Sequence, residues 1–230
     1  MAEDKLTQLE NKIENKFEDR DILLQALTHR SYLNENPKWG KDHNERLEFL
    51  GDAVLELVVT EYLYKNYPNP EGEMTNWRAS LVNAVMLARI ATELDINDYI
   101  LLSKGEAKDT GRARQYILAN AMESLIGAIY LDGGYDASKK FIEKFILKEL
   151  SGIIENQLYR DAKSLFQEKA QEKAGITPTY EVLKEWGPDH ARNFQIGVFL
   201  EKEMIGVGDG PSKQEAQQVA ASDALKKKGW

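Results

Sequence analysis

Hydrophobic residues recur at helical spacing over most of the first 155 positions. Apolar side chains three or four positions apart are typical of an amphipathic helix, and they run longest over residues 45–64, 81–94, 116–130 and 139–154. Two polar breaks, YPNPEG at 67–72 and DGGY at 132–135, contain the proline, glycine and asparagine that turns require. No segment in this part alternates clearly as a strand does. The pattern predicts an all-α domain.

The pattern changes after Ile154 and indicates a small α+β domain. We predict a helix over 164–174, three strands and a final helix over 213–227, in the order α-β-β-β-α. The strand pattern is clearest where hydrophobic residues alternate with polar or small ones, at Phe194, Ile196, Val198 and Leu200. The predicted division is a helical domain, a linker and an α+β domain, over residues 1–155, 156–160 and 161–230.

Both helices of the second domain begin with a residue pair typical of helix starts. Ser164 precedes Gln167 by three positions, and Ser212 precedes Glu215 by the same spacing. In such a capping box, the hydroxyl and the acid or amide side chain each satisfy a free backbone donor of the first turn. We expect both serines to cap their helices.

Composition narrows the chemistry that the chain can perform. Of 230 residues, 42% are hydrophobic, which suffices for a buried core, and no stretch is apolar for long enough to span a membrane. The polar, acidic first residues do not resemble a secretory signal, so we predict a cytoplasmic protein. The chain has no cysteine and three histidines, which excludes disulfides and cysteine-ligated zinc. Any metal should be a hard cation that prefers oxygen ligands.

One predicted helix carries acidic residues on one face. Glu45, Glu48 and Asp52 fall within roughly 60° of one another at 100° per residue. We expect the opposite face to form core through Leu47, Leu50, Val54 and Leu57. A single acidic face is more often solvated surface than a site, and the net charge of -8 argues mildly against a nucleic-acid partner.

A second helix repeats the spacing and favours a site. Asn120, Glu123 and Gly127 lie at i, i+3 and i+7, again away from the hydrophobic positions Leu118, Met122, Leu125 and Ile129. Crowded carboxylates are unfavourable unless a cation offsets their charge. We therefore predict that the two helices pack side by side, with Gly127 leaving room for close approach, and present oxygen ligands to a divalent metal.

Phe49 is out of place on the acidic helix. It lies beside the carboxylates and not among the core leucines. A large exposed aromatic residue is typical of an interface, so we predict that Phe49 contacts another subunit.

Several segments together resemble the ribonuclease III family. HNERLEFLGDAVL at 43–55 resembles its hallmark segment, and ALTHRSY at 26–32 resembles the run that precedes it. Two further family blocks follow in order, EGEMTNWRASLV at 71–82 and YILANAMESLIGAIYLDGG at 116–134, and DAKSLFQEKAQ at 161–171 resembles the start of the family's double-stranded-RNA-binding domain. The resemblance implies a helical endonuclease domain that forms a homodimer, followed by an RNA-binding domain.

The resemblance also implies roles for particular residues. It places metal ligands at Glu48, Asn120 and Glu123 and the essential acids at Asp52 and Glu123, with Mg²⁺ as the metal and Mn²⁺ as an alternative. Accessory acids are implied at Glu45 and Glu71, and Phe49 matches the aromatic residue that inserts into the partner subunit. The family usually has aspartate where this chain has Asn120, whose amide oxygen can ligate Mg²⁺ but carries no charge.

The second domain should bind RNA through three regions. A double-stranded RNA reader contacts two minor grooves and the phosphates between them, and here the matching positions are Gln167, Glu168, His190, Ser212, Lys213 and Gln214. Residues 161–230 contain ten Lys/Arg against eleven Asp/Glu, which gives thin electrostatic support. Without the resemblance, an ordinary α+β domain would explain the pattern equally well.

The resemblance implies Mg²⁺-dependent cleavage of double-stranded RNA to 5′-phosphate and 3′-hydroxyl products, and we expect it to act in the processing of structured precursors such as rRNA and mRNA. The alternative is a double-stranded-RNA-binding protein whose cleavage is weakened or lost because of Asn120. A helical protein-interaction scaffold is a third possibility. It predicts neither cleavage nor salt-sensitive binding of duplex RNA.

Overall fold

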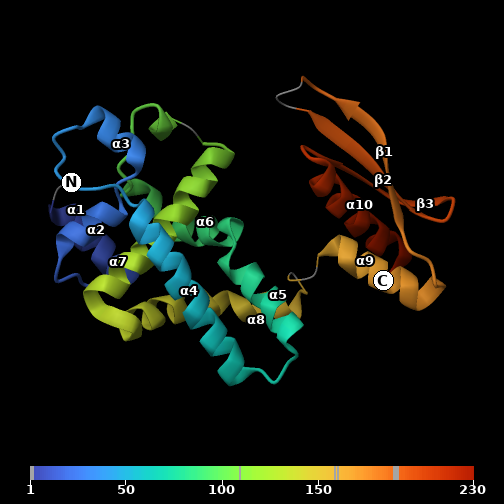
Figure 1. Ribbon diagram of the computed structural model, residues 1–230, viewed down its shortest axis with the longest axis horizontal. Helices are drawn as coiled ribbons and strands as arrows, with labels where there is room; N and C mark the ends of the chain where they lie inside the picture. Colours follow the sequence, from blue (N-terminus) through green and yellow to red (C-terminus); the bar gives the residue numbers. More distant parts are fainter. Residues whose placement is uncertain (1–2, 109, 158, 160, 189–191) are drawn as a thin grey trace. The chain divides into compact units, whose positions relative to one another are not determined.

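A computed structural model describes residues 3–108, 110–157, 159, 161–188 and 192–230. The chain forms two compact units, Met1–Tyr159 and Arg160–Trp230 (Figure 1). Each unit has its own hydrophobic core, and each is described by itself below.

Unit 1 is built from helices, as predicted. They are α1 (Glu3–Ile13), α2 (Arg20–Ala26), α3 (Arg30–Glu35), α4 (Glu45–Asn66), α5 (Glu71–Val82), α6 (Ala84–Glu93), η1 (Ile96–Asp98), η2 (Glu106–Lys108), α7 (Arg112–Phe145), η3 (Leu147–Glu149) and α8 (Leu150–Glu155). An isolated parallel bridge joins Thr28 to Leu101. In the described part of the chain, no helix is both long and apolar enough to cross a membrane.

Two helix boundaries differ from the prediction. The helix expected over 81–94 begins only at Ala84, because Asn83 is extended and its side chain accepts a hydrogen bond from the Met86 N–H at 2.9 Å. The two preceding residues end α5 instead. The turn expected over 67–72 ends at Pro70, whose fixed φ suits a helix start.

The DGGY segment interrupts the helical backbone, as predicted. Helix α7 consists of two helical segments that meet at a kink, where Gly134 has a non-helical conformation that L side chains rarely adopt (φ 74°, ψ -169°). The helix expected over 139–154 is divided among the end of α7, η3 and α8.

Helix α4 packs along α7 at the centre of unit 1 (Figure 1). Leu55, Val58, Leu125 and Ile126 are among the fully buried side chains of this core. Leu57, expected in the core, is 58% exposed. The periodicity predicted the helix correctly, but the buried face of the helix is narrower than predicted and does not include Leu57.

Unit 2 has the expected α-β-β-β-α order: α9 (Ala162–Ala174), β1 (Thr179–Trp186), β2 (Asn193–Leu200), β3 (Glu203–Gly210) and α10 (Lys213–Lys228). The strands form an antiparallel sheet in the order β1-β2-β3. Both helices lie on one face of the sheet, and the core includes Phe166, Val198 and Ala220 (Figure 1). The predicted fold class is confirmed for both units.

The two helix starts in unit 2 differ from each other. Ser212 caps α10 as predicted, accepting a hydrogen bond from the Glu215 N–H at 3.2 Å. Ser164 does not cap α9. Asp161 does, and it accepts from the Ser164 N–H at 2.7 Å. A carboxylate three residues earlier fulfils the same role, and it adds a full negative charge near the helix N-terminus.

Candidate active site and RNA-binding surface

Two glycines set the distance between α4 and α7. A β-carbon on Gly51 would overlap the Glu123 carbonyl oxygen, and one on Gly127 would overlap the Leu47 carbonyl oxygen. Glycine inside a helix costs stability relative to alanine, so a pair of them facing each other requires a packing reason. Here it is the close contact of two helix backbones, which places the side chains of α4 beside those of α7.

A buried polar junction fixes the N-terminal end of α4 against α7. The Ser124 hydroxyl donates to the Asn120 carbonyl oxygen at 2.7 Å and lies 3.4 Å from the Asn44 carbonyl oxygen. The Asn44 side chain in turn donates to the Ala26 carbonyl oxygen at 3.4 Å. Sequence reasoning missed Asn44 and Ser124, although a serine on the hydrophobic face of a predicted helix is a signal for such a bond.

The carboxylates of the two helices meet at this crossing. Burial, together with the charges of Asp52 and Glu48, raises the pKa of Glu123 to about 7. The pKa of Glu48 is also raised, by burial and by the charges of Glu45 and Asp52. Such shifts are typical of functional sites where like charges are held together. The structure thus places Glu48 and Asp52 within electrostatic reach of Glu123, and Glu45 within reach of Glu48.

Asn120 belongs to the same group. Its side chain makes a hydrogen bond with Glu48 that opposes the rise in the pKa of that carboxyl. Glu45 is more exposed, and it pairs with Arg30 at 3.1 Å.

The donor set fits a hard divalent cation. Glu48 and Glu123 offer carboxylate oxygens and Asn120 an amide oxygen, the ligand types that Mg²⁺ and Mn²⁺ take, and a cation would offset the crowded negative charge. Within the described residues, no three His, Cys, Asp or Glu side chains are close enough to share one ion. Asp52 acts on both Glu48 and Glu123 through its charge.

Glu71 lies apart from this group in the single chain. It begins α5, accepts a hydrogen bond from the Thr75 hydroxyl at 2.9 Å and borders a hollow of about 300 Å³. The other residues lining this hollow are Thr60, Leu63, Tyr64, Met74, Thr75 and Arg78. At 1.5 Å per residue, Thr60 is roughly 18 Å along α4 from Glu48. One chain does not bring Glu71 to the carboxylates.

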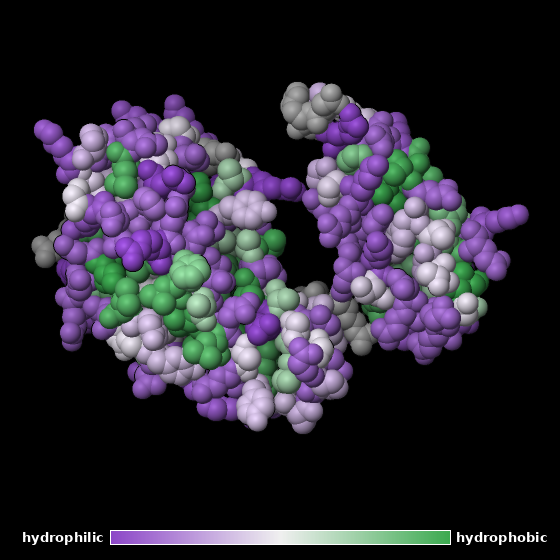
Figure 2. All heavy atoms as spheres, viewed as in Figure 1, coloured by the Kyte–Doolittle hydropathy of each residue, from purple (hydrophilic) through white to green (hydrophobic). Residues whose placement is uncertain are grey.

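An apolar stripe runs along the exposed side of α4. Phe49 is 82% exposed, and Leu57 and Tyr64 continue the stripe at spacings of about two helical turns. Figure 2 shows hydrophobic residues gathered on the surface of unit 1 over the part of the fold where Figure 1 draws α4. Exposed apolar area of this kind is typical of a protein–protein interface.

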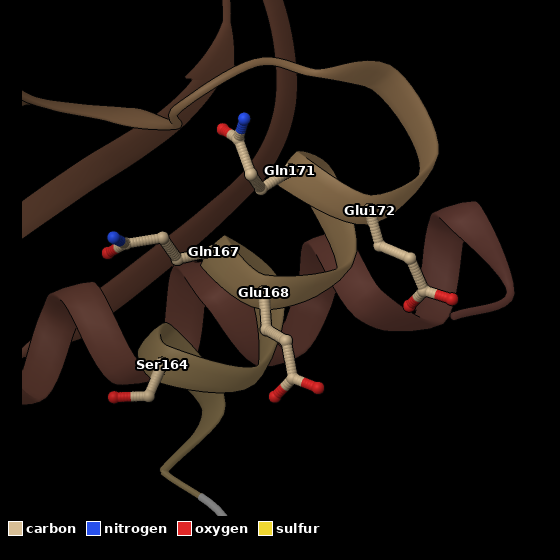
Figure 3. A pocket seen from close by; sticks show the side chains of 5 residues that line it. All are labelled: Ser164, Gln167, Glu168, Gln171 and Glu172. Atoms are coloured by element: carbon tan, nitrogen blue, oxygen red, sulfur yellow. The ribbon is translucent and has the colours of Figure 1, made fainter.

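The first predicted RNA-contact region lies on α9. Gln167 and Glu168 are exposed and border a hollow of about 500 Å³ with Ser164, Gln171 and Glu172. The side chains of Ser164, Gln167 and Gln171 extend from successive turns of α9, as Figure 3 shows. The hollow offers hydroxyl, amide and carboxylate groups, which suit hydrogen bonding with ribose hydroxyls and base edges in a minor groove.

The other predicted contacts lie at the start of α10. Lys213 and Gln214 are exposed in its first turn, directly after the capping Ser212, where free backbone N–H groups and the helix dipole favour phosphate. His190 lies outside the described residues, so its position stays a prediction.

Comparisons with known proteins cover nearly the whole chain. A family profile described as Ribonuclease-III-like matches residues 19–150, and one described as a double-stranded RNA binding motif matches residues 162–228. Ribonuclease 3 of Pelotomaculum thermopropionicum is 44% identical over 98% of this chain and 94% of its own length. Ribonuclease 3 of Natranaerobius thermophilus is 48% identical over 92% and 91%.

Solved structures of a nuclease domain resemble unit 1. One crystal structure of the ribonuclease III nuclease domain from Campylobacter jejuni matches with a TM-score of 0.56 and 40% identity, over 65% of this chain and 97% of that one. Another, described for structural flexibility in a region involved in dimer formation, matches with a TM-score of 0.55 and 42% identity, over 61% and 94%.

Proposed function

Since the chain belongs to the ribonuclease III family and is an endoribonuclease of that type, we propose that it cleaves double-stranded RNA in a Mg²⁺-dependent reaction at the α4–α7 crossing. The convergence of Glu48, Asp52 and Glu123 with Asn120 carries this proposal. The double-stranded RNA binding motif at 162–228 supplies the substrate-binding domain. Structured precursors such as rRNA and mRNA are the proposed substrates, and the cytoplasm is the proposed location.

We assign a separate role to each residue of the site. Glu48, Asn120 and Glu123 would hold the cation, with Mn²⁺ as the alternative to Mg²⁺, while Asp52 and Glu123 orient the attacking water. A bound divalent ion supplies a more acidic water and charge stabilisation for the phosphoryl oxygens. The water oxygen bonds to phosphorus as the P–O3′ bond breaks, and the departing 3′ oxygen takes up a proton. The products are a 5′-phosphate and a 3′-hydroxyl, with one strand cut at each site.

The decisive experiment incubates the purified protein with a long RNA duplex, with and without Mg²⁺. We expect fragments only with Mg²⁺, and their 5′ ends should be labelled by kinase only after phosphatase treatment. Glu123→Gln should abolish cleavage but not the gel shift. Glu143→Gln, the same change on the exposed side of α7, should cleave normally. Equal cleavage by both variants would refute this assignment of the site.

Asn120 favours a second candidate, a double-stranded-RNA-binding protein with weakened cleavage. Its neutral amide leaves the site one charge short of the usual family pattern, which lowers metal affinity. We expect Asn120→Asp to reduce the Mg²⁺ concentration for half-maximal cleavage. Wild-type protein that shifts the duplex but leaves it intact at every Mg²⁺ and Mn²⁺ concentration would establish the binding protein instead.

We further propose that the chain acts as a homodimer through the α4 stripe. The exposed Phe49 and the hollow beside Tyr64 are complementary in size, and the hollow has room for an aromatic side chain. The Campylobacter jejuni nuclease domain, whose description includes dimer formation, supports this pairing. If Phe49 of one copy entered the hollow of the other, Glu48 beside it would approach the other copy's Glu71. That pairing would bring the accessory acid to the carboxylates.

The proposed dimer can be tested by measuring the mass of the protein in solution by sedimentation. Phe49→Ala should sediment as a monomer at low micromolar concentration, where the wild-type chain sediments as a dimer. Tyr116→Ala removes another exposed aromatic side chain, from α7, and should leave the dimer intact. A dimeric Phe49→Ala protein, or a monomeric wild type, would exclude this interface.

A further inference from the structure

One carboxylate in unit 2 pairs with two cations. Glu185 lies near the end of β1, opposite Phe194 of β2. Its Oε1 is 3.5 Å from the Lys213 Nζ, and its Oε2 is 3.6 Å from the Arg192 Nη1. The Lys213 ammonium also lies 5.4 Å from the centroid of the Phe194 ring. The four side chains form one cluster between the strand ends and the start of α10.

Both cations of the cluster stand where phosphate is expected. Lys213 is the first residue of α10, beside the free N–H groups that follow the Ser212 cap. Arg192 directly precedes β2, at the end of the β1–β2 connection that contains the predicted contact His190. A phosphate that approached Lys213 or Arg192 would find that cation already paired with the Glu185 carboxylate.

We propose that Glu185 limits the affinity of this domain for duplex RNA by competing with phosphate for Lys213 and Arg192. The inference rests on the proposed RNA surface at the start of α10. Exposed ion pairs at these distances are weak, so RNA can displace the carboxylate. The displaced carboxylate then repels the phosphates, and fewer counterions are released for each bound duplex than the number of cations suggests.

The same strand provides a matched control. Glu181 is an exposed carboxylate of β1 opposite Gly197, and it makes no ion pair with any residue that the structure describes. Glu181→Gln and Glu185→Gln change the net charge of the chain equally. Only the second removes the carboxylate that pairs with Lys213 and Arg192.

The test measures binding of a 20-base-pair RNA duplex to the full-length protein in EDTA, by fluorescence anisotropy over a range of salt concentrations. Glu185→Gln should bind about three- to tenfold tighter at 0.15 M salt, and the slope of log K against log salt should steepen by about one. Glu181→Gln should stay within about twofold of wild type. Far-ultraviolet circular dichroism and a thermal melt confirm that each variant is folded.

A double-mutant cycle distinguishes failure of the Glu185 inference from failure of the proposed RNA surface. Lys213→Gln should weaken binding about fivefold, and adding Glu185→Gln to it should restore far less than Glu185→Gln gains alone. If Lys213→Gln weakens binding but Glu185→Gln binds no tighter than Glu181→Gln, the inference is wrong and the RNA surface stands. If Lys213→Gln binds as wild type does, the RNA surface is misplaced and the inference falls with it.

Discussion

Removing the negative charge of Glu123 should stabilise the folded chain. Its carboxyl lies beside Asp52 and Glu48, and its pKa is raised from 4.5 to about 7. At pH 8 without metal, the folded chain therefore holds an ionised carboxylate that its surroundings disfavour. Glutamine keeps the shape of the side chain and removes the charge, so Glu123→Gln isolates the electrostatic contribution.

The size and sign of the effect follow from proton linkage. A tenfold change in a proton-binding constant corresponds to about 1.4 kcal/mol, so the rise in pKa from 4.5 to about 7 sets an upper bound of about 3.5 kcal/mol. Because Glu123 is only partly buried, solvent screening reduces this to about 2 kcal/mol. The folded-state pKa lies above the unfolded value, so the cost is absent below pH 4.5, grows between pH 4.5 and 7 and stays constant above pH 7.

The assay is thermal unfolding in EDTA at fixed protein concentration, at pH 5 and at pH 8. Glu123→Gln should raise the Tm by about 4–8 °C at pH 8 and by far less at pH 5. Mg²⁺ should stabilise the wild-type chain more than the variant, because a ligand stabilises the state that binds it. Glu143→Gln serves as the control and should not change the Tm at either pH. A Glu123→Gln protein that melts at or below the wild-type temperature at pH 8 would show that the crowded carboxylates cost the fold nothing.

Two further predictions concern packing and helix capping. Gly51→Ala should destabilise unit 1 by about 3 kcal/mol or more, because the new methyl group overlaps the Glu123 backbone. Gly152→Ala, where a β-carbon meets nothing within 4 Å, should change the free energy of unfolding by less than about 1 kcal/mol, and equal losses would refute the packing argument. Asp161→Ala should cost unit 2 about 1 kcal/mol as a lost N-cap. Ser164→Ala should cost less than half of that in the same denaturant titration, and the reverse order would restore the serine as the cap.

Much of the geometry of the candidate site could be predicted because it depends on helical period alone. The common face of Glu48 and Asp52 on one helix, and of Asn120 and Glu123 on another, follows from 100° per residue. Gly127 within the second stripe also indicated the close approach that the structure contains.

The errors arose where a partner in space decides the outcome. Leu57 has the right spacing for core but lies on an exposed face of α4. Glu71 follows a turn, and neither its distance from Glu48 nor its place beside a hollow is encoded in local spacing. Asp161 and Ser164 are both good caps by composition, and only the backbone conformation at Asp161 distinguishes them. The pairing of Glu185 with Lys213 links β1 to α10, which no periodicity reveals.

The glycine contact between α4 and α7 also determines when the nuclease can first act. The proposed ligands Glu48 and Glu123 are 75 positions apart in the sequence, so the ribosome releases the first well before the second. At roughly 5–20 residues per second, that interval lasts about 4–15 s. During it α4 lacks the helix whose backbone must lie against Gly51. Under the proposed site assignment, the nascent chain cannot cleave RNA until α7 has emerged and packed, and completion of the core is the event that allows cleavage to begin.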